Sequence, residues 1–249
     1  MKTYEVTNIG KRTTNEDHVA IITKNDQQMI ALVCDGMGGH NSGELASKIV
    51  CEYICDCFRI MPVFRNDGEA SGWLSEVVKD ANRLTKRQSL TSPAHQGMGT
   101  TLVLALIYQK QVFIASVGDS RAYRIDDQEI VQLTEDDTFV NELIKSNIIT
   151  KEEAKNHPKR NVLMKAMGVS EDIEVEIQTY PLQVGYLLLC SDGLYNGENE
   201  KQIQNVVLQS CSLKEKCDRL VDEAIENGSR DNISIALIEI EGRDLSELE

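Results

Sequence analysis

Four aspartates in this chain have the surroundings of metal-binding carboxylates. Each lies where an apolar run meets a turn of small residues, and they are Asp35, Asp119, Asp192 and Asp231. A glycine stands beside each of the first three, and a backbone freed by glycine can turn both a carboxylate and a carbonyl oxygen toward one cation. Mg²⁺ and Mn²⁺ prefer such oxygen ligands. The pattern therefore indicates a divalent-cation site.

The four aspartates can form one site only if they meet in space. In an antiparallel sheet, the end of one strand and the start of the next lie at the same edge, so all four can converge. Converging carboxylates repel one another or take up protons, and a divalent cation is the usual counter-charge. Chance is the alternative, because the chain has 40 acidic residues and some must end strands. The repetition in three separate runs favours the metal site.

The elements that must position these carboxylates are predicted to be antiparallel strands and covering helices. Short connections and β-branched runs favour a series of hairpins over helical crossovers. Strands are predicted at 18–23, 29–34, 100–108, 111–117, 121–125, 173–180, 185–190 and 233–238, the first two as an antiparallel pair. Helices are predicted at 42–58, 70–88, 139–145, 151–156, 200–209 and 213–227. The polar stretch around the two shortest helices is predicted to be a surface insert.

Composition narrows the class of protein. The chain has 249 residues, 41% of them hydrophobic, and four prolines, which predicts one compact domain over residues 1–249. A formal charge of −14 argues against a nucleic-acid partner, since phosphate backbones require a positive surface. The N-terminus lacks an apolar leader segment and the apolar runs are too short to span a bilayer. Seven cysteines without zinc-type spacing fit a reducing compartment, so we expect a soluble cytoplasmic monomer.

Six motifs, in order, resemble those of a known family. They are Arg12-Thr13-Thr14-Asn15-Glu16-Asp17, Asp35-Gly36-Met37-Gly38-Gly39-His40, Gly97-Met98-Gly99-Thr100-Thr101, Val117-Gly118-Asp119-Ser120-Arg121, Ser191-Asp192-Gly193 and Asp231-Asn232. This set is similar to that of the metal-dependent serine/threonine protein phosphatases of type 2C, the PPM family, and is closest in pattern to the bacterial members. The resemblance covers nearly the whole chain.

The resemblance implies a fold and a metal centre. The fold would be α+β, a four-layer α-β-β-α sandwich with two antiparallel sheets flanked by helices. Two Mn²⁺ or Mg²⁺ ions would lie at one edge of the sheets, with room for a third. By position, Asp35 would bridge both ions, the carbonyl of Gly36 would bind one, and Asp192 and Asp231 would complete the other.

Four more residues take their roles from the same resemblance. Glu16 and Asp17 would act mostly through metal-bound waters. Asp119 matches the third-metal position, which it would share with Asp192, and Arg12 matches the arginine that grips the substrate phosphate. A bidentate guanidinium clamp of this kind is one that lysine cannot reproduce.

The implied activity is hydrolysis of phosphoserine and phosphothreonine in proteins. A water or hydroxide that bridges the two metal ions would attack phosphorus directly, without a covalent enzyme intermediate. Two metals can supply hydroxide near neutral pH and neutralise charge that moves to the leaving oxygen. The partners would be phosphoproteins, namely the substrates of a serine/threonine kinase and the kinase itself.

The chain departs from the family pattern at three places. Methionine stands at position 37, where animal members have a histidine proposed as general acid, and His40 could replace that acid or only hold the glycine turn. Asp137 stands where the bacterial pattern has histidine, in an insert spanning 136–170 that the family places beside the active site. The pair Tyr195-Asn196 is also unfamiliar.

Two other functions remain open at this point. One is a two-metal hydrolase of a different phosphate ester, such as a phosphodiester or nucleotide, although the acidic surface argues against polyanionic substrates. The other is a catalytically silent binding module that keeps the fold. Missing metal ligands would indicate the silent module, and none of the expected ligands is missing from the sequence.

Overall fold

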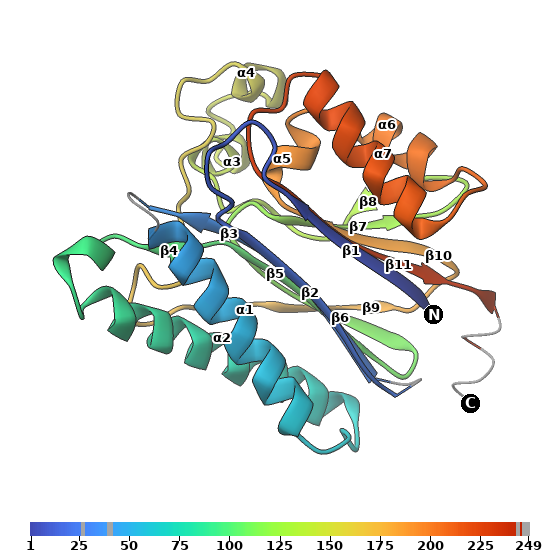
Figure 1. The fold of residues 1–249 in the computed structure, drawn as a ribbon, viewed down its shortest axis with the longest axis horizontal. Helices are drawn as coiled ribbons and strands as arrows, with labels where there is room; N and C mark the ends of the chain where they lie inside the picture. The colour runs from blue at the N-terminus through green and yellow to red at the C-terminus, as the bar shows by residue number, and fades with distance from the viewer. Residues whose placement is uncertain (26–27, 39–41, 243–244, 246–249) are drawn as a thin grey trace.

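The protein is described by a computed structural model over residues 1–25, 28–38, 42–242 and 245. Two antiparallel sheets pack face to face, and helices cover both outer faces (Figure 1). The five-stranded sheet has the order β1-β11-β10-β7-β8, and the other has the order β2-β3-β5-β6-β9, with β4 paired to β3. The predicted α+β sandwich is therefore confirmed.

The strands have the following bounds. The first sheet contains β1 (Lys2–Asn8), β7 (Arg121–Ile125), β8 (Ile130–Gln132), β10 (Gly185–Cys190) and β11 (Ile233–Ile240). The second contains β2 (Asp17–Asn25), β3 (Gln28–Met37), β4 (Gly99–Thr100), β5 (Leu102–Tyr108), β6 (Gln111–Val117) and β9 (Ile177–Pro181). The predicted antiparallel pairing of the first two runs is confirmed, since β2 pairs with β3 from Asp17 opposite Asp35 onward.

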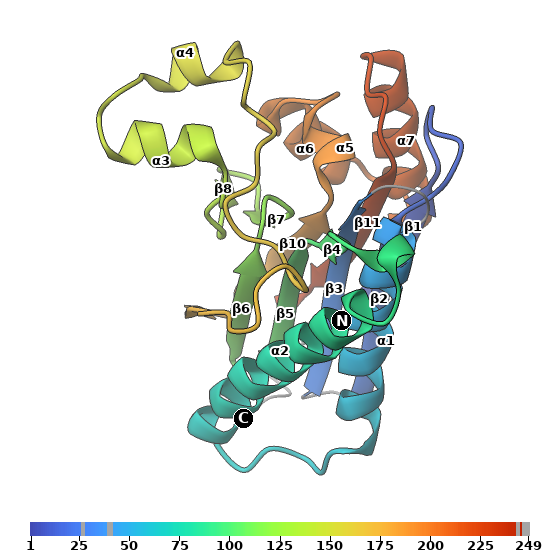
Figure 2. The ribbon, with the colours of Figure 1, turned by 90° about the vertical axis from the view of Figure 1, so that its left-hand side faces the viewer.

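The helices form the two outer layers and the insert. Helices α1 (Ser42–Ile60) and α2 (Asp67–Ser89) cover the second sheet, and a short 3₁₀ helix, η1 (Pro93–His95), follows them. Helices α5 (Asp192–Tyr195), α6 (Glu200–Val207) and α7 (Leu213–Glu226) cover the first sheet. Helices α3 (Phe139–Lys145) and α4 (Lys151–Lys155) stand beyond the edge that carries β7 and β8 (Figure 2).

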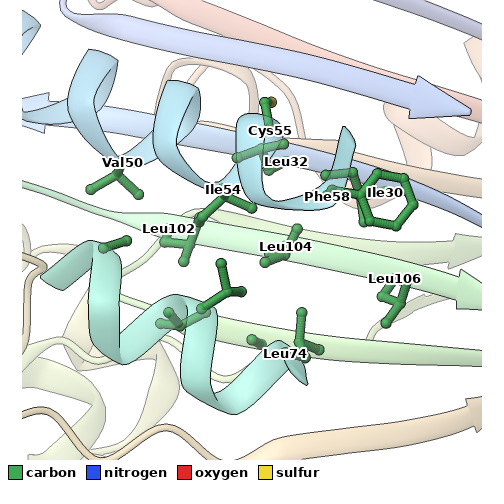
Figure 3. Close-up of a cluster of buried hydrophobic side chains, with 14 of the residues drawn as sticks. Ile30, Leu32, Val50, Ile54, Cys55, Phe58, Leu74, Leu102, Leu104 and Leu106 are labelled. Atoms are coloured by element: carbon green, nitrogen blue, oxygen red, sulfur yellow. The ribbon is translucent and has the colours of Figure 1, made fainter. Parts of the chain in front are cut away.

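The apolar runs build three separate cores because successive side chains of a strand point to opposite faces. On β3, Ile30 and Leu32 pack against α1 and α2 (Figure 3), whereas Met29 and Ala31 pack between the two sheets. Alternate side chains of strand β11 likewise pack into the core between the two sheets and into the core beneath helices α6 and α7. A strand covered on both faces reads as a continuous apolar run, which is why these segments lack polar alternation.

Two predicted features of the strands are wrong. Asp35 does not end its strand, because Gly36 and Met37 extend β3 by pairing with Thr100 and Gly99 of β4. The strand predicted at 173–180 begins only at Ile177, where pairing with β6 starts.

The predicted series of hairpins is also interrupted. Strands β5 and β6 form a hairpin, but β6 and β7 belong to different sheets. The chain crosses between the sheets at Gly118, whose φ of 94° suits glycine. Strands β1 and β8 and the short helix α5 were not predicted, because they are short or lack a clear apolar period. Among the described residues, no helix combines the length and the apolar character needed to cross a membrane.

Candidate metal centre

The predicted aspartates lie at one end of the sandwich. Asp35 is near the end of β3 and faces Asp17, its register partner on β2. Asp119, Asp192 and Asp231 each lie two residues outside a strand, namely β6, β10 and β11. The other four carboxylates all lie close enough to Asp35 to influence its ionisation. The convergence that the sequence required is present.

The electrostatics of this end are those of crowded, buried carboxylates. Burial raises the pKa of Asp35 well above its usual range, and repulsion from the other four aspartates raises it further. Burial, with repulsion from Asp119 and Asp231, raises the pKa of Asp192 to about 8. Burial also raises the pKa values of Asp17 and Asp119, each to about 6. This cluster of buried aspartates therefore lacks a positive counter-charge at its centre.

The donor set fits a divalent cation. The Oδ1 atom of Asp192 is buried and has no hydrogen-bond partner among the described residues, while its Oδ2 atom accepts from Asn196 Nδ2 at 3.0 Å. A buried acceptor without a donor is costly, and a cation that prefers oxygen would satisfy it. Within the described ranges, no three Asp, Glu, His or Cys side chains are placed so that they could hold a metal ion without moving. Asp231 instead accepts a hydrogen bond from Arg12 Nη2 at 2.6 Å.

Gly36 is required by close packing beneath Asp35. A Cβ atom at this position would lie 2.6 Å from the carbonyl oxygen of Glu16 and closer still to that of Gly43. The Gly36 amide donates to the Glu16 carbonyl at 3.1 Å. The end of β3 is thereby held against both the loop before β2 and the first turn of α1.

Two threonines hold the backbone of Asp35. The Asp35 amide donates to Thr101 Oγ1 at 2.9 Å, and its carbonyl accepts from Thr100 Oγ1 at 2.9 Å and from the Thr101 amide at 2.8 Å. The Gly97–Thr101 motif therefore acts through the backbone of the central aspartate. None of these hydrogen bonds involves the Asp35 carboxylate.

Asn232 fastens the segment that carries Arg12, Glu16 and Asp17. Its Nδ2 atom donates to the carbonyls of Ile9 and Thr14, both at 2.9 Å, and its Oδ1 atom accepts from the Glu16 amide at 2.9 Å. Sequence reasoning quoted Asn232 only as a neighbour of Asp231. The sequence feature that could have indicated this role is the position of Asn232 in the Asp-Asn pair.

Asp17 and Glu16 occupy different environments. Asp17 is 4% exposed and its Oδ2 atom accepts from Ser191 Oγ at 2.7 Å. Ser191 in turn accepts from the Ser234 amide at 3.0 Å, so the start of β11 fixes this carboxylate. The Glu16 carboxylate lies against Gly43, and burial raises its pKa.

A second network joins Asp119 to the insert. The Tyr195 hydroxyl donates to the Asp119 carbonyl at 2.9 Å, and the Arg121 guanidinium stacks 3.6 Å from the centre of the Tyr195 ring. Arg121 also forms a bidentate pair with Asp136, with its Nη2 atom 2.6 Å from Oδ2. The sequence marked the pair Tyr195-Asn196 as unfamiliar but gave Tyr195 no role, because its partner Asp119 lies in the distant turn between β6 and β7.

Asp137 performs a definite structural task where the bacterial pattern has histidine. The Gly118 amide donates to Asp137 Oδ2 at 3.2 Å, and the Asp137 amide donates to the Gly118 carbonyl at 2.8 Å. The Lys165 ammonium lies 3.3 Å from its Oδ1 atom. The root of the insert is therefore bonded to the turn that carries Asp119.

The insert borders a cleft of about 1210 Å³ that opens onto the aspartates. Arg12, Asp119, Asp192 and Asp231 line its inner part, and residues of α3, α4 and the following turn line its outer part. Met37 is half-buried in β3 opposite Gly99. His40, named above as an alternative acid, lies outside the described residues.

Comparisons with known proteins agree with this geometry. The profile of the protein phosphatase 2C family matches residues 6–234. The serine/threonine phosphatase stp of Listeria monocytogenes is 38% identical over 237 residues, which are 95% of this chain and 93% of that protein. Protein phosphatase PhpP of Streptococcus pneumoniae is 34% identical over 241 residues, 96% of this chain and 97% of that one.

Solved structures agree as well. The crystal structure of serine/threonine phosphatase Stp1 from Staphylococcus aureus has a TM-score of 0.92 and 37% identity, covering 97% of this chain and 95% of that one. The catalytic domain of the phosphatase PstP, solved with two manganese ions, has a TM-score of 0.82 and 30% identity, covering 96% and 97%. The resemblance that the six motifs predicted is confirmed.

Proposed function

This chain belongs to the protein phosphatase 2C family, and from that premise we propose that it hydrolyses phosphoserine and phosphothreonine in phosphoproteins. The observation that carries the proposal is the convergence of five aspartates, three of which line one cleft together with Arg12. The family depends on Mn²⁺ or Mg²⁺, and a structural relative was solved with two manganese ions. The enzyme is therefore a metal-dependent phosphomonoester hydrolase.

We propose the metal ligands that the family resemblance implies, and the convergence of the aspartates supports them. Asp35 would contact both ions, the Gly36 carbonyl would join it on one, and Asp192 and Asp231 would hold the other. Asp119 would share a third position with Asp192. When bound, the two ions supply a nucleophilic hydroxide near neutral pH and neutralise negative charge on the phosphate.

The side chains around the ligands prepare this site. Ser191 fixes Asp17, and the packing against Gly43 fixes Glu16, so both can orient water at the inner end of the cleft. The buried carboxyl groups hold protons until a cation replaces them, which limits their mutual repulsion.

Arg12 would bind the phosphate. Its side chain is 55% exposed at the cleft and its guanidinium fork can donate to two phosphate oxygens at once. Met37 has no ionisable proton, so the leaving serine or threonine oxygen would take its proton from water.

The test is phosphate release from a phosphothreonine peptide with Mn²⁺. Asp35→Asn keeps the size of the side chain and removes the bridging charge, so its rate should fall more than about a hundredfold, the upper range for losing an outer-shell partner of a metal. Asp218→Asn is the matched control, because Asp218 is exposed on α7 and pairs only with Lys214 among the described residues. Equal rates for wild type and Asp35→Asn would refute the proposal.

We also propose that the chain acts in the cytoplasm as a monomeric single domain and opposes a serine/threonine kinase. All seven cysteines carry free thiols, which suits a reducing compartment. The shared core between the two sheets supports one folding unit. Light scattering that gives a mass near 27.9 kDa would support the monomer, and a dimer mass would contradict it.

A further inference from the structure

We propose that the outer cleft binds acidic residues that flank the phosphorylated side chain, so that the preferred substrates are phosphosites in acidic segments. This inference rests on the proposed function and names its substrate class. It comes from three cations on the walls of the cleft that the metal centre and its ion pairs do not use.

The cleft has two walls and an acidic inner end. One wall is the insert with α3 and α4, which stands away from the sandwich (Figure 2). The other wall is formed by α5 and by the turn at 228–231 between α7 and β11. The inner end holds Arg12 and the aspartates. A bound phosphoresidue would therefore have chain on both sides of it, in contact with both walls.

Three basic side chains line these walls without a partner among the described residues. Lys151 and Arg160 belong to the insert, and Arg230 belongs to the opposite turn. All three are exposed, and none of them forms an ion pair or a side-chain hydrogen bond within the described ranges. The cleft thus carries unneutralised positive charge on both sides.

The other cations of the cleft are already neutralised. Lys145 lies 3.0 Å from Glu135, and Lys155 lies 3.1 Å from Glu152. Arg121 is held by Asp136. The contrast shows that the insert does not pair all its bases internally, although the chain has 40 acidic residues available.

The charge of the whole chain makes the location of these cations informative. With a net charge of −14, most of the surface repels an acidic segment. Lys151, Arg160 and Arg230 offer it attraction beside the site of reaction. Complementary charge in one place and like charge elsewhere sets the orientation of a partner more than its affinity.

The size of the cleft agrees with a peptide. Its volume of about 1210 Å³ exceeds the range of roughly 300–1,000 Å³ that holds a drug-sized molecule. A phosphorylated side chain alone would leave the outer part empty. Several flanking residues can therefore lie between Lys151 and Arg230 while the phosphate reaches Arg12.

The experiment compares two phosphothreonine peptides that differ only in their flanks, Asp and Glu in one and Asn and Gln in the other. The readout is the ratio of kcat/KM for the acidic peptide to that for the neutral one, at low and at moderate salt. Exposed charge pairs contribute about 0.2–1 kcal/mol each, or about 1.4- to 5-fold. Wild type should prefer the acidic peptide about tenfold at low salt, mainly through KM, and less at moderate salt.

The variants locate the effect. Lys151→Gln combined with Arg230→Gln should bring the ratio to within about twofold of one, and Arg160→Gln should lower it further. Lys214→Gln is the matched control, because Lys214 is an exposed base on α7 that does not line the cleft. It should keep the wild-type ratio. A melting temperature for each variant checks that folding is intact.

Two results would overturn the proposal, and they differ from failure of the proposed function. Equal kcat/KM for both peptides in wild type would show that the enzyme does not distinguish acidic from neutral flanking residues. A preference that survives in the double variant would place its origin elsewhere. If neither peptide is hydrolysed with Mn²⁺ present, the phosphatase assignment fails and this inference fails with it.

Discussion

Metal binding to this protein should release protons from its buried carboxyl groups. The pKa of Asp192 is raised to about 8 by burial and by its acidic neighbours, so in the metal-free protein it is about 90% protonated at pH 7. The pKa of Asp35 is also raised well above its usual range, by burial and by repulsion from the other aspartates. Asp17 and Asp119, with pKa values of about 6, are each about 10% protonated at that pH.

A divalent cation must displace these protons to reach the carboxylate oxygens. At least one proton, that of Asp192, should therefore leave when Mn²⁺ binds at pH 7. Because the protonated fraction of the carboxyl groups increases as the pH falls, the Mn²⁺ affinity should increase with pH, by up to about tenfold between pH 6 and pH 7 for each proton released. The dependence should flatten above the pKa of Asp192.

Calorimetry measures this directly. Mn²⁺ is titrated at pH 7 into the metal-free protein in two buffers with different ionisation enthalpies, and the difference in heat gives the protons released. Asp192→Asn should release about one proton fewer, because the amide has none to lose. The same heat in both buffers, together with an affinity that is constant from pH 6 to pH 8, would refute the picture of protonated, crowded carboxylates.

Three further predictions concern single side chains. Arg12→Lys should lower kcat/KM for a phosphopeptide by tenfold or more, about 1.4 kcal/mol, because lysine cannot form the bidentate clamp; an unchanged value would remove Arg12 from phosphate binding. Tyr195→Phe keeps the ring under Arg121 and deletes only the hydrogen bond to the Asp119 carbonyl, so it should raise the Mn²⁺ concentration for half-maximal activity about two- to tenfold, near 1 kcal/mol, whereas a shift in melting temperature alone would show a purely structural role. Glu198 is 2% exposed, neither of its carboxylate oxygens has a hydrogen-bond partner in the part of the chain that the structure describes, and burial raises its pKa to about 8. A raised pKa favours the folded state at low pH and this stability is lost as the pH rises from 4.5 through 8, so Glu198→Gln should raise the melting temperature by about 2–4 °C at pH 8 and have little effect at pH 5; equal shifts at both values would contradict the assignment.

The sequence was sufficient where one local pattern decides the outcome. The continuous apolar runs predicted the central strands because these strands are covered on both faces, as at Ile30 and Met29 of β3. Antiparallel geometry predicted that the aspartates could meet at one edge, and the packing of the two sheets completes this convergence, because Asp35 belongs to one sheet whereas Asp192 and Asp231 flank strands of the other. The family resemblance supplied the layer order and the roles of Arg12 and Gly36.

The sequence was insufficient where contacts between residues far apart in the chain decide the structure. Asp35 looked like the end of a strand, because only its pairing partner β4 carries the strand on to Met37. The chain passes from one sheet to the other at Gly118, and the spacing of the hydrophobic residues around this position does not reveal the crossing. The bonds from Asn232 to Thr14 and from Tyr195 to Asp119 join residues 218 and 76 positions apart. Such contacts become visible only when the sheets are assembled.

The central claim is that Asp35, Gly36, Asp192 and Asp231 hold a pair of divalent cations. The most direct measurement is anomalous diffraction at the manganese edge from crystals of this protein grown with Mn²⁺. We predict two peaks, one within about 2.0–2.3 Å of Asp35 and the Gly36 carbonyl, and one within the same distance of Asp35, Asp192 and Asp231. Manganese peaks that lie only elsewhere, or none within bonding distance of Asp35, would contradict the account.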